Sequence, residues 1–218
     1  MSGPDLDRLS AADSSVRLQA ALAVGTAAEP EALEVLVARC AVDEDFFVRD
    51  MLTWALTRLP AAVVVPRLLA ELASPLPQAR SQALHTLSKV GDPATWPAVS
   101  GALLHDPHDE VARSAWRAAV ALVPDGAAPG LAVELLRELG RGDDDLQRSL
   151  SRALVALGED VLRPLLADAE STGTPDARIH AVATGRLLDD PDAAFGPALE
   201  AAQRAAALGP GPIPGAAG

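Results

Sequence analysis

Residues 45–56 read DFFVRDMLTWAL, and five other segments of the chain share their pattern. The six segments, called repeats one to six here, are DSSVRLQAALAV at 13–24, DFFVRDMLTWAL at 45–56, LPQARSQALHTL at 76–87, HDEVARSAWRAA at 108–119, DDDLQRSLSRAL at 143–154 and TPDARIHAVATG at 174–185. Their fourth residues, called anchors, lie 32, 31, 32, 35 and 31 positions apart. A period this regular indicates stacked units, each of which buries its apolar face against its neighbours.

Each segment also has the periodicity of a helix. In residues 45–56 the apolar residues Val48, Leu52, Ala55 and Leu56 lie on one face of a helix with 3.6 residues per turn. A second helical pattern follows each segment, at 31–42, 62–72, 95–104, 130–140, 160–170 and 192–208. The sequence therefore predicts six helical hairpins.

The expected turns and helix starts agree with this division. The residues expected between the two helices of a hairpin are Gly25, Pro60, Gly91, Pro124, Gly158 and Pro191. The side chains of Asp13, Asp45 and Asp143 are placed to accept hydrogen bonds from the first free amides of their helices.

These features resemble the HEAT repeat in its short bacterial form, the PBS-lyase HEAT-like repeat. The resemblance rests on the D-x-x-V-R start, the period and the small residues of the helices, and it covers residues 13 to about 208. It implies an all-α fold, a right-handed α-solenoid of about six helical hairpins. In that family the Arg after the anchor commonly bonds to an acidic loop residue of a neighbouring repeat. Arg17, Arg49, Arg80 and Arg178 match that Arg, whereas Ala112 and Gln147 replace it in repeats four and five.

The chain is predicted to hold one solenoid without a domain boundary. Residues 1–12 are expected to form a polar N-terminal arm, and residues 13–208 a single cooperative stack. The last ten residues, GPGPIPGAAG at 209–218, are rich in Gly and Pro and are expected to be disordered.

Composition excludes several classes of function. A formal net charge of -12 argues against a long contact with nucleic acid or an anionic membrane. Cys40 is the sole cysteine, so no intramolecular disulfide or paired-cysteine site can form. The polar N-terminus lacks the pattern of a signal peptide, and no apolar run approaches the roughly 18 residues that span a bilayer. We expect a cytoplasmic protein, and a single lysine, Lys89, beside many arginines indicates a GC-rich, bacterial genome.

Phe46 and Phe47 have no counterparts in the other repeats, which hold small or polar residues at these two places. The repeat therefore does not require them. One interpretation is an apolar patch on one edge of the solenoid that binds a partner. The other is that both rings fill a gap under the loop that starts at Val42.

Two tryptophans are expected to be partly exposed. Counting about 100° per residue from each anchor places Trp54 and Trp116 away from the centre of the core face. Exposed tryptophan is common at binding interfaces, so both are candidate partner-binding residues. The alternative is that the stacking of repeats covers them. Trp96, which follows the turn at 91–93, is expected to pack between helices.

The outward ridge of the first helices carries a line of cations. Arg113, Arg117, Arg148 and Arg152 occupy this ridge in repeats four and five. Helical-repeat DNA glycosylases of the alkylpurine type combine Trp and Arg on a similar solenoid, so these four residues are candidate ligands for a phosphate group. A solvated face with charges at i and i+4 explains the same line.

No catalytic residue, cofactor or metal site is predicted. The segment HDPHDE at 105–110 holds two His and three carboxylates, but Asp and His also gather there as helix caps. The four histidines are scattered, and no phosphate loop or nucleophile elbow is present. Covalent handling of a chromophore would have Cys40 as its sole thiol. The leading hypothesis is a non-catalytic scaffold that binds a protein or peptide, and the alternative is binding of nucleic acid or a phosphate-bearing ligand.

Overall fold

The computed structural model describes residues 3–190 and 195–208, and every regular element in those ranges is helical. The described chain forms two compact units, Met1–Pro124 and Asp125–Gly218, and each is described by itself. The division falls in repeat four, between its two predicted helices. The tail predicted at 209–218 lies outside the described residues.

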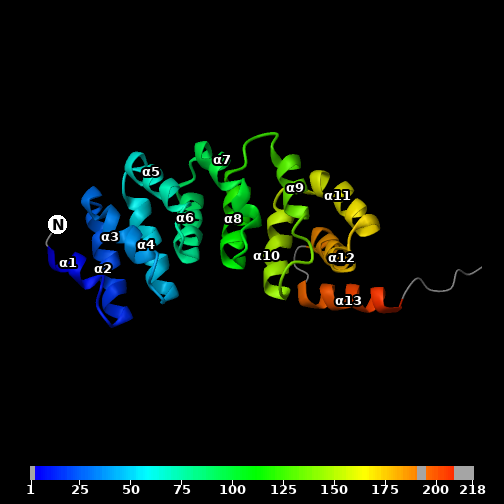
Figure 1. The fold of residues 1–218 in the computed structure, drawn as a ribbon, viewed down its shortest axis with the longest axis horizontal. Helices are drawn as coiled ribbons and strands as arrows, with labels where there is room; N and C mark the ends of the chain where they lie inside the picture. The colour runs from blue at the N-terminus through cyan, green and yellow to red at the C-terminus, as the bar shows by residue number, and fades with distance from the viewer. Residues whose placement is uncertain (1–2, 191–194, 209–218) are drawn as a thin grey trace, which may run out of the picture. The chain divides into compact units, whose positions relative to one another are not determined.

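The first helices of unit 1 start where the repeats predict. They are α2 (Ser14–Ala27), α4 (Phe46–Arg58), α6 (Pro77–Val90) and α8 (Asp109–Leu122), and each begins one residue after the start of its segment. Asp13 accepts a hydrogen bond from the Ser15 amide, and Asp45 accepts from the amides of Phe47 and Val48. The predicted caps are therefore confirmed in both helices. Figure 1 shows the four helices in a row, with α2 against α4, α4 against α6 and α6 against α8.

Small polar side chains let these helices approach one another. The hydroxyl groups of Thr53 on α4 and Thr86 on α6 are 3.5 Å apart, and those of Ser81 on α6 and Ser114 on α8 are 2.9 Å apart. All four side chains are buried, so each pair satisfies polar atoms that water cannot reach. Leucine and alanine side chains from the same helices form the core around them.

The second helices of unit 1 are less regular. A 3-10 turn, η1 (Pro30–Ala32), leads into α3 (Leu33–Cys40), and α5 (Ala61–Glu71) follows the turn at Pro60. The single helix predicted at 95–104 is wrong. The chain forms η2 (Pro93–Thr95), a four-residue helix α7 (Trp96–Val99) and η3 (Ala102–His105) instead. The interruption lies at Ser100 and Gly101, and the Gly101 backbone (φ -97°, ψ -134°) is not helical.

Two local predictions in repeat one also differ from the structure. Gly25 lies inside α2 and not between helices, and the helix ends at Ala28 in the left-handed conformation. Gly25 faces the Trp54 ring of α4. The segment expected to be an arm contains a helix, α1 (Gly3–Arg8), which packs on α2, and Leu9 after it is buried.

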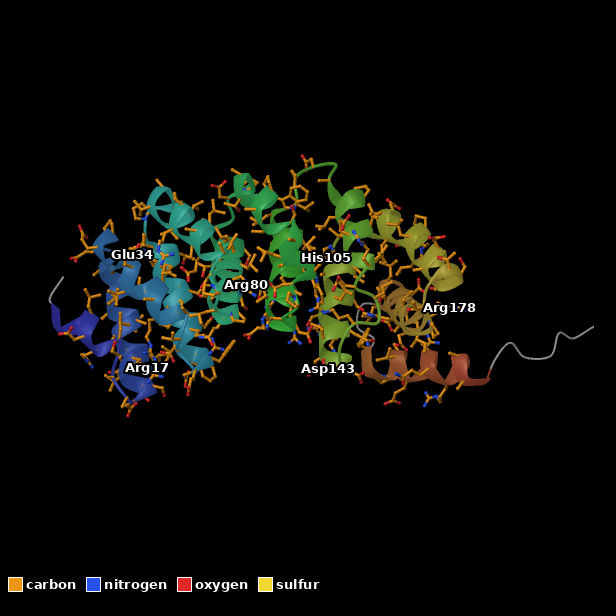
Figure 2. All side chains as sticks on the ribbon, viewed as in Figure 1. Arg17, Glu34, Arg80, His105, Asp143 and Arg178 are labelled. Carbon is orange, nitrogen blue, oxygen red and sulfur yellow. The ribbon has the colours of Figure 1, made fainter. Side chains whose placement is uncertain are left out.

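Arginine bridges connect repeats, as the resemblance implies. The Nε and Nη2 atoms of Arg17 donate to both carboxylate oxygens of Asp43 (2.8 and 2.9 Å). Arg80 binds Asp106 in the same way, at 3.1 Å for each hydrogen bond, and Figure 2 labels both arginines. Burial would raise the pKa of Asp43, but the hydrogen bonds from Arg17 and Arg39 hold it at about 2.

The bridge is missing from the other two matching arginines. Arg49 donates through Nη1 to the carbonyls of Asp43 and Glu44, but its buried Nε has no partner among the described residues. Arg178 donates to the carbonyl of Glu170 instead of a carboxylate. The position equivalent to Asp43 and Asp106 in the loop that follows repeat two is Ser74.

Unit 2 contains the remaining helices. They are α9 (Ala128–Leu136), α10 (Asp144–Val155), α11 (Glu159–Thr172), α12 (Pro175–Asp189) and α13 (Phe195–Leu208). The Asp143 side chain accepts from the Leu146 amide, which confirms the third predicted cap. Helix α12 packs against α10, α11 and α13.

A buried polar cluster joins α10 to α12. His180 Nδ1 accepts from the Gly140 amide, so Nε2 carries the proton and lies 2.9 Å from Ser151 Oγ. Ser151 Oγ is also 2.8 Å from Thr184 Oγ1. Burial lowers the pKa of His180 to about 4, against the opposing effect of the Gln147 carbonyl, so the ring is neutral at pH 7. The cluster is accounted for by helix packing in unit 2.

Candidate functional site

A groove with a volume of about 290 Å³ crosses three first helices of unit 1. It is called the α4–α8 groove here. Its lining consists of Phe46, Arg49 and Asp50 on α4, Ser81, Gln82 and His85 on α6, and Glu110, Arg113, Ser114 and Arg117 on α8. The groove therefore contains both an aromatic residue singled out by the sequence and two of the four candidate phosphate-binding arginines.

The repeat register explains why these side chains meet. Asp50, Ser81 and Arg113 each lie two residues after their anchor, and His85 and Arg117 each lie six residues after theirs. Because α4, α6 and α8 lie side by side, equivalent positions form rows across them. Arg113 and Arg117 of the predicted line border the groove, whereas Ser81 in the same row is buried.

The α8 end of the groove is cationic. Neither Arg113 nor Arg117 has an ion-pair partner among the described residues, and Arg113 Nε is buried without a hydrogen bond. Arg117 Nη2 donates to Ser114 Oγ at 3.3 Å. Partial burial is the larger cause that lowers the pKa of Arg117, and the charge of Arg113 is the second. The charge of Glu110 acts in the opposite direction. These two arginines thus hold their charges close together with little compensation.

The floor and the centre of the groove are polar. Ser81 and Ser114 are buried and bonded to each other, and the Ser81 hydroxyl also lies 3.4 Å from the Glu110 carbonyl oxygen. Burial first, and then the charges of Arg117 and Lys89, lower the pKa of His85, which is therefore neutral at pH 7.

The α4 end carries an exposed aromatic pair beside the charged side chains of Arg49 and Asp50. Phe46 and Phe47 keep 65% and 71% of their surface in contact with solvent, and their rings meet edge to face with centroids 5.6 Å apart. The interpretation that they fill a gap under Val42 is therefore wrong. Phe46 contributes to the groove wall, so the exposed pair lies at its mouth.

Trp54 is partly exposed, as the helical count predicts, at 38%. Its ring lies over Gly25 of α2, where an added Cβ would come within 2.5 Å of the ring carbon Cζ3. Trp54 therefore covers the neighbouring helix and still shows one side to solvent. It is not among the residues that line the α4–α8 groove.

Trp116 is not exposed, and the prediction for it is wrong. It is fully buried, and its Nε1 donates to the Leu104 carbonyl at 2.8 Å. The broken segment α7–η3 packs on this side of α8, where a count along one helix cannot foresee it. Trp96 packs there too, as predicted, and donates to the Ala119 carbonyl at 3.1 Å.

The other two arginines of the predicted line, Arg148 and Arg152, lie on α10 of unit 2. Arg148 forms an ion pair with Asp145 three residues earlier, at 3.2 Å. This pairing is what the interpretation as a solvated helix face expects at that position.

The remaining chemical candidates lie elsewhere in unit 1. In the segment at 105–110, Asp106 binds Arg80 and accepts from the His108 amide. No group of three metal-ligating side chains gathers anywhere in the described ranges. Cys40 is buried, and burial raises the pKa of its thiol to about 12, so it does not supply a thiolate at neutral pH.

Sequence reasoning missed the polar side of the groove. Gln82, Ser114 and Arg49 were not singled out, although Arg49 was recognised as a repeat residue. The signal that could have found Gln82 and Ser114 is their equivalent place, three residues after their anchors. A ridge read along one helix does not show which side chains of neighbouring helices border the same hollow.

Comparisons with known proteins identify the fold. No family model matches the chain, and no curated protein sequence matches it. Among solved structures, Kap121p bound to Ste12p aligns with 90% of this chain and 24% of its own, with 19% identity and a TM-score of 0.58. An engineered protein aligns with 91% of this chain and 96% of its own, with 18% identity and a TM-score of 0.45. The CpcE–CpcF complex of phycocyanin lyase from Nostoc sp. PCC7120 aligns with 84% of this chain and 75% of its own, with 22% identity and a TM-score of 0.46.

The likeness to Kap121p shows that the chain has an all-α fold of the helical-solenoid type, as predicted. It covers about a quarter of that protein. Within the described residues, every helix is too short or too polar to cross a membrane.

Proposed function

We propose that the chain is a non-catalytic, HEAT-like scaffold that binds a protein or peptide through the α4–α8 groove and the Phe46–Phe47 pair at its mouth. The exposure of these two rings carries the proposal. The equivalent positions in repeat one are Ser14 and Ser15, so the fold of a repeat does not need large apolar groups there.

The energetics favour a partner that covers the pair. Burying one Phe side chain is worth about 1.5–3 kcal/mol relative to leaving it in water. Two adjacent rings of this kind are typical anchors of an interface, and a groove beside them offers room for a chain. Kap121p, which shares the fold, has been solved with Ste12p bound, which supports this use of a solenoid without identifying the partner. The acidic composition and the sole, buried cysteine fit a bacterial cytoplasm.

The test replaces Phe46 and Phe47 with serine, which copies repeat one. Proteins captured from the native host by the wild-type chain are identified by mass spectrometry and compared with those captured by the double variant. We expect at least one partner to be lost by tenfold or more. A matched control is Val133→Ser, which removes another exposed apolar side chain, in unit 2. If every captured protein stays bound to the Phe variant, the pair is not the binding edge.

A phosphate-bearing ligand is the second candidate, because Arg113 and Arg117 lack ion-pair partners within the described chain. Such binding would weaken steeply with salt. A titration with duplex and single-stranded DNA at low ionic strength separates the two functions, and no binding there excludes nucleic acid.

A further inference from the structure

We propose that the partner is a peptide segment with a carboxylate side chain, Asp or Glu, that binds Arg113 and Arg117 while an apolar side chain of the same segment covers Phe46 and Phe47. This inference rests on the proposed function and names the chemistry of the partner.

The first argument is the state of the two arginines. They lie on successive turns of α8, line one hollow and have no ion-pair partner among the residues described. A guanidinium group presents donors in a fixed fork that matches a carboxylate or a phosphate. The same chain shows this geometry where an acid is available, since Arg17 and Arg80 each bind a carboxylate through Nε and Nη2.

The second argument is that the site is already organised. The Ser114 hydroxyl accepts from Arg117 and is bonded in turn to Ser81, so one guanidinium is held against the groove floor. An anion therefore meets a cation whose guanidinium is directed toward the groove floor by one hydrogen bond. Pre-organisation of this kind lowers the entropic cost of binding.

The third argument is the polarity along the groove. At the α4 end the charges of Arg49 and Asp50 offset each other, whereas Arg113 and Arg117 attract an anion at the α8 end. Glu110 reduces the positive charge there but does not cancel it, because two arginines face one carboxylate. The apolar pair lies at the opposite end from these arginines, so the occupant has one orientation.

The width of the groove sets the spacing of the two recognition groups. Helix α6 lies between α4 and α8, and packed helix axes are about 8–10 Å apart, which places the two ends roughly 16–20 Å apart. An extended peptide advances about 3.3 Å per residue. About five or six residues should therefore separate the apolar and the anionic side chains of the bound segment.

The test uses a displayed library of random twelve-residue peptides as the probe. Peptides enriched on the wild-type chain are synthesised, and their affinities are measured by fluorescence anisotropy. We expect the enriched peptides to share an Asp or Glu about five or six residues from an aromatic or aliphatic residue. Changing that acid to its amide should weaken binding at least tenfold. The chain variant Arg113→Ser with Arg117→Gln should weaken binding of the acidic peptide equally and leave the amide peptide unaffected.

Arg163→Gln serves as the control, because Arg163 is exposed in unit 2 and pairs with Glu159 and Asp189. Circular dichroism spectra must show that each variant is folded. Replacing the acid by phosphoserine tests the source of the charge: equal or weaker binding supports a carboxylate, and tighter binding would overturn it in favour of a phosphate.

Other outcomes overturn the inference. If the enriched peptides need Phe46 and Phe47 but are insensitive to the arginine and amide changes, the anion site is wrong and the proposed function stands. If no peptide is enriched, or if enriched peptides ignore both ends of the groove, both proposals are wrong. Competition by DNA that depends on the arginines and not on the Phe pair would assign the site to nucleic acid.

Discussion

At the scale of single residues, the repeats act as controls for one another. Arg17 and Arg80 each bind a carboxylate of the next loop, at Asp43 and Asp106. Both acids also accept a hydrogen bond from the amide two residues later, and Ser74 Oγ does the same for the Leu76 amide. Ser74 thus occupies the equivalent place. Its side chain has one oxygen where aspartate has two, so it offers no carboxylate to the unpartnered Nε of Arg49.

Replacing Ser74 with aspartate should therefore stabilise the chain. The new carboxylate can accept from the buried Nε of Arg49, and a charge-assisted hydrogen bond of this kind should raise the free energy of unfolding by about 1 kcal/mol. The measurement is urea unfolding at pH 7. Pairing lowers the pKa of the new carboxyl group in the folded state. The gain in unfolding free energy should therefore be present above about pH 4, and it should disappear on acidification as the carboxylate takes up a proton.

Two variants control this prediction. Ser74→Asn introduces a side chain of the size of aspartate without its charge, so this variant should gain less stability. Ser74→Asp in a chain that also carries Arg49→Met should gain nothing, because the partner is absent. An equal gain with and without Arg49 would show that the effect comes from the turn and not from the bridge.

The same comparison explains what could be predicted about the site. Phe46 and Phe47 differ from every other repeat, and the structure shows them exposed. Trp116 also stands out in the sequence, but the irregular segment α7–η3 covers it. The count along a helix gives the direction of a side chain, whereas burial depends on neighbouring elements that the period does not describe.

At the scale of elements, the first helices were predictable because their starts are encoded locally. Four of the six begin after a residue whose side chain caps the helix: Asp13, Asp45, Asp143 and Thr174. Among the second helices whose starts are described, α3, α5, α9 and α11 have no side-chain cap. The predicted helix at 95–104 is broken at Gly101, and Gly25 is helical although glycine suggested a turn. The break at Gly101 follows the low helix propensity of glycine, whereas at Gly25 close packing against α4 accompanies a helical glycine.

Position 25 needs a glycine because the Trp54 ring fills the space that a side chain would occupy. A Cβ added there would lie 2.5 Å from the Trp54 ring and 2.8 Å from the Ala55 Cα. Gly25→Ala should therefore destabilise the chain by about 2 kcal/mol, as overpacking does, although alanine favours helices. Thermal unfolding measures the loss.

The control for this substitution is Gly130→Ala in α9, where the added Cβ meets nothing within 4 Å. That variant should gain about 0.5–1 kcal/mol from helix propensity. If both glycine variants change stability in the same direction, the close approach of α4 to α2 does not explain Gly25.

At the scale of the whole molecule, the question is whether the two compact units unfold together. The repeat pattern continues from repeat one to repeat six, and stacked repeats gain stability from their neighbours. This continuity predicts a single cooperative transition over residues 13–208. The helices on each side of residue 124 would then have no independent stability.

The distribution of tryptophan allows a direct test. All three tryptophans, Trp54, Trp96 and Trp116, belong to unit 1, so their fluorescence reports residues 1–124 alone. Far-ultraviolet circular dichroism reports the helices of both units. We expect the two signals to give the same midpoint and the same slope in urea, because coincident transitions indicate two-state unfolding. Separate midpoints would contradict the single stack, and since the α4–α8 groove is built entirely from unit 1, residues 1–124 would then be expected to retain binding without unit 2.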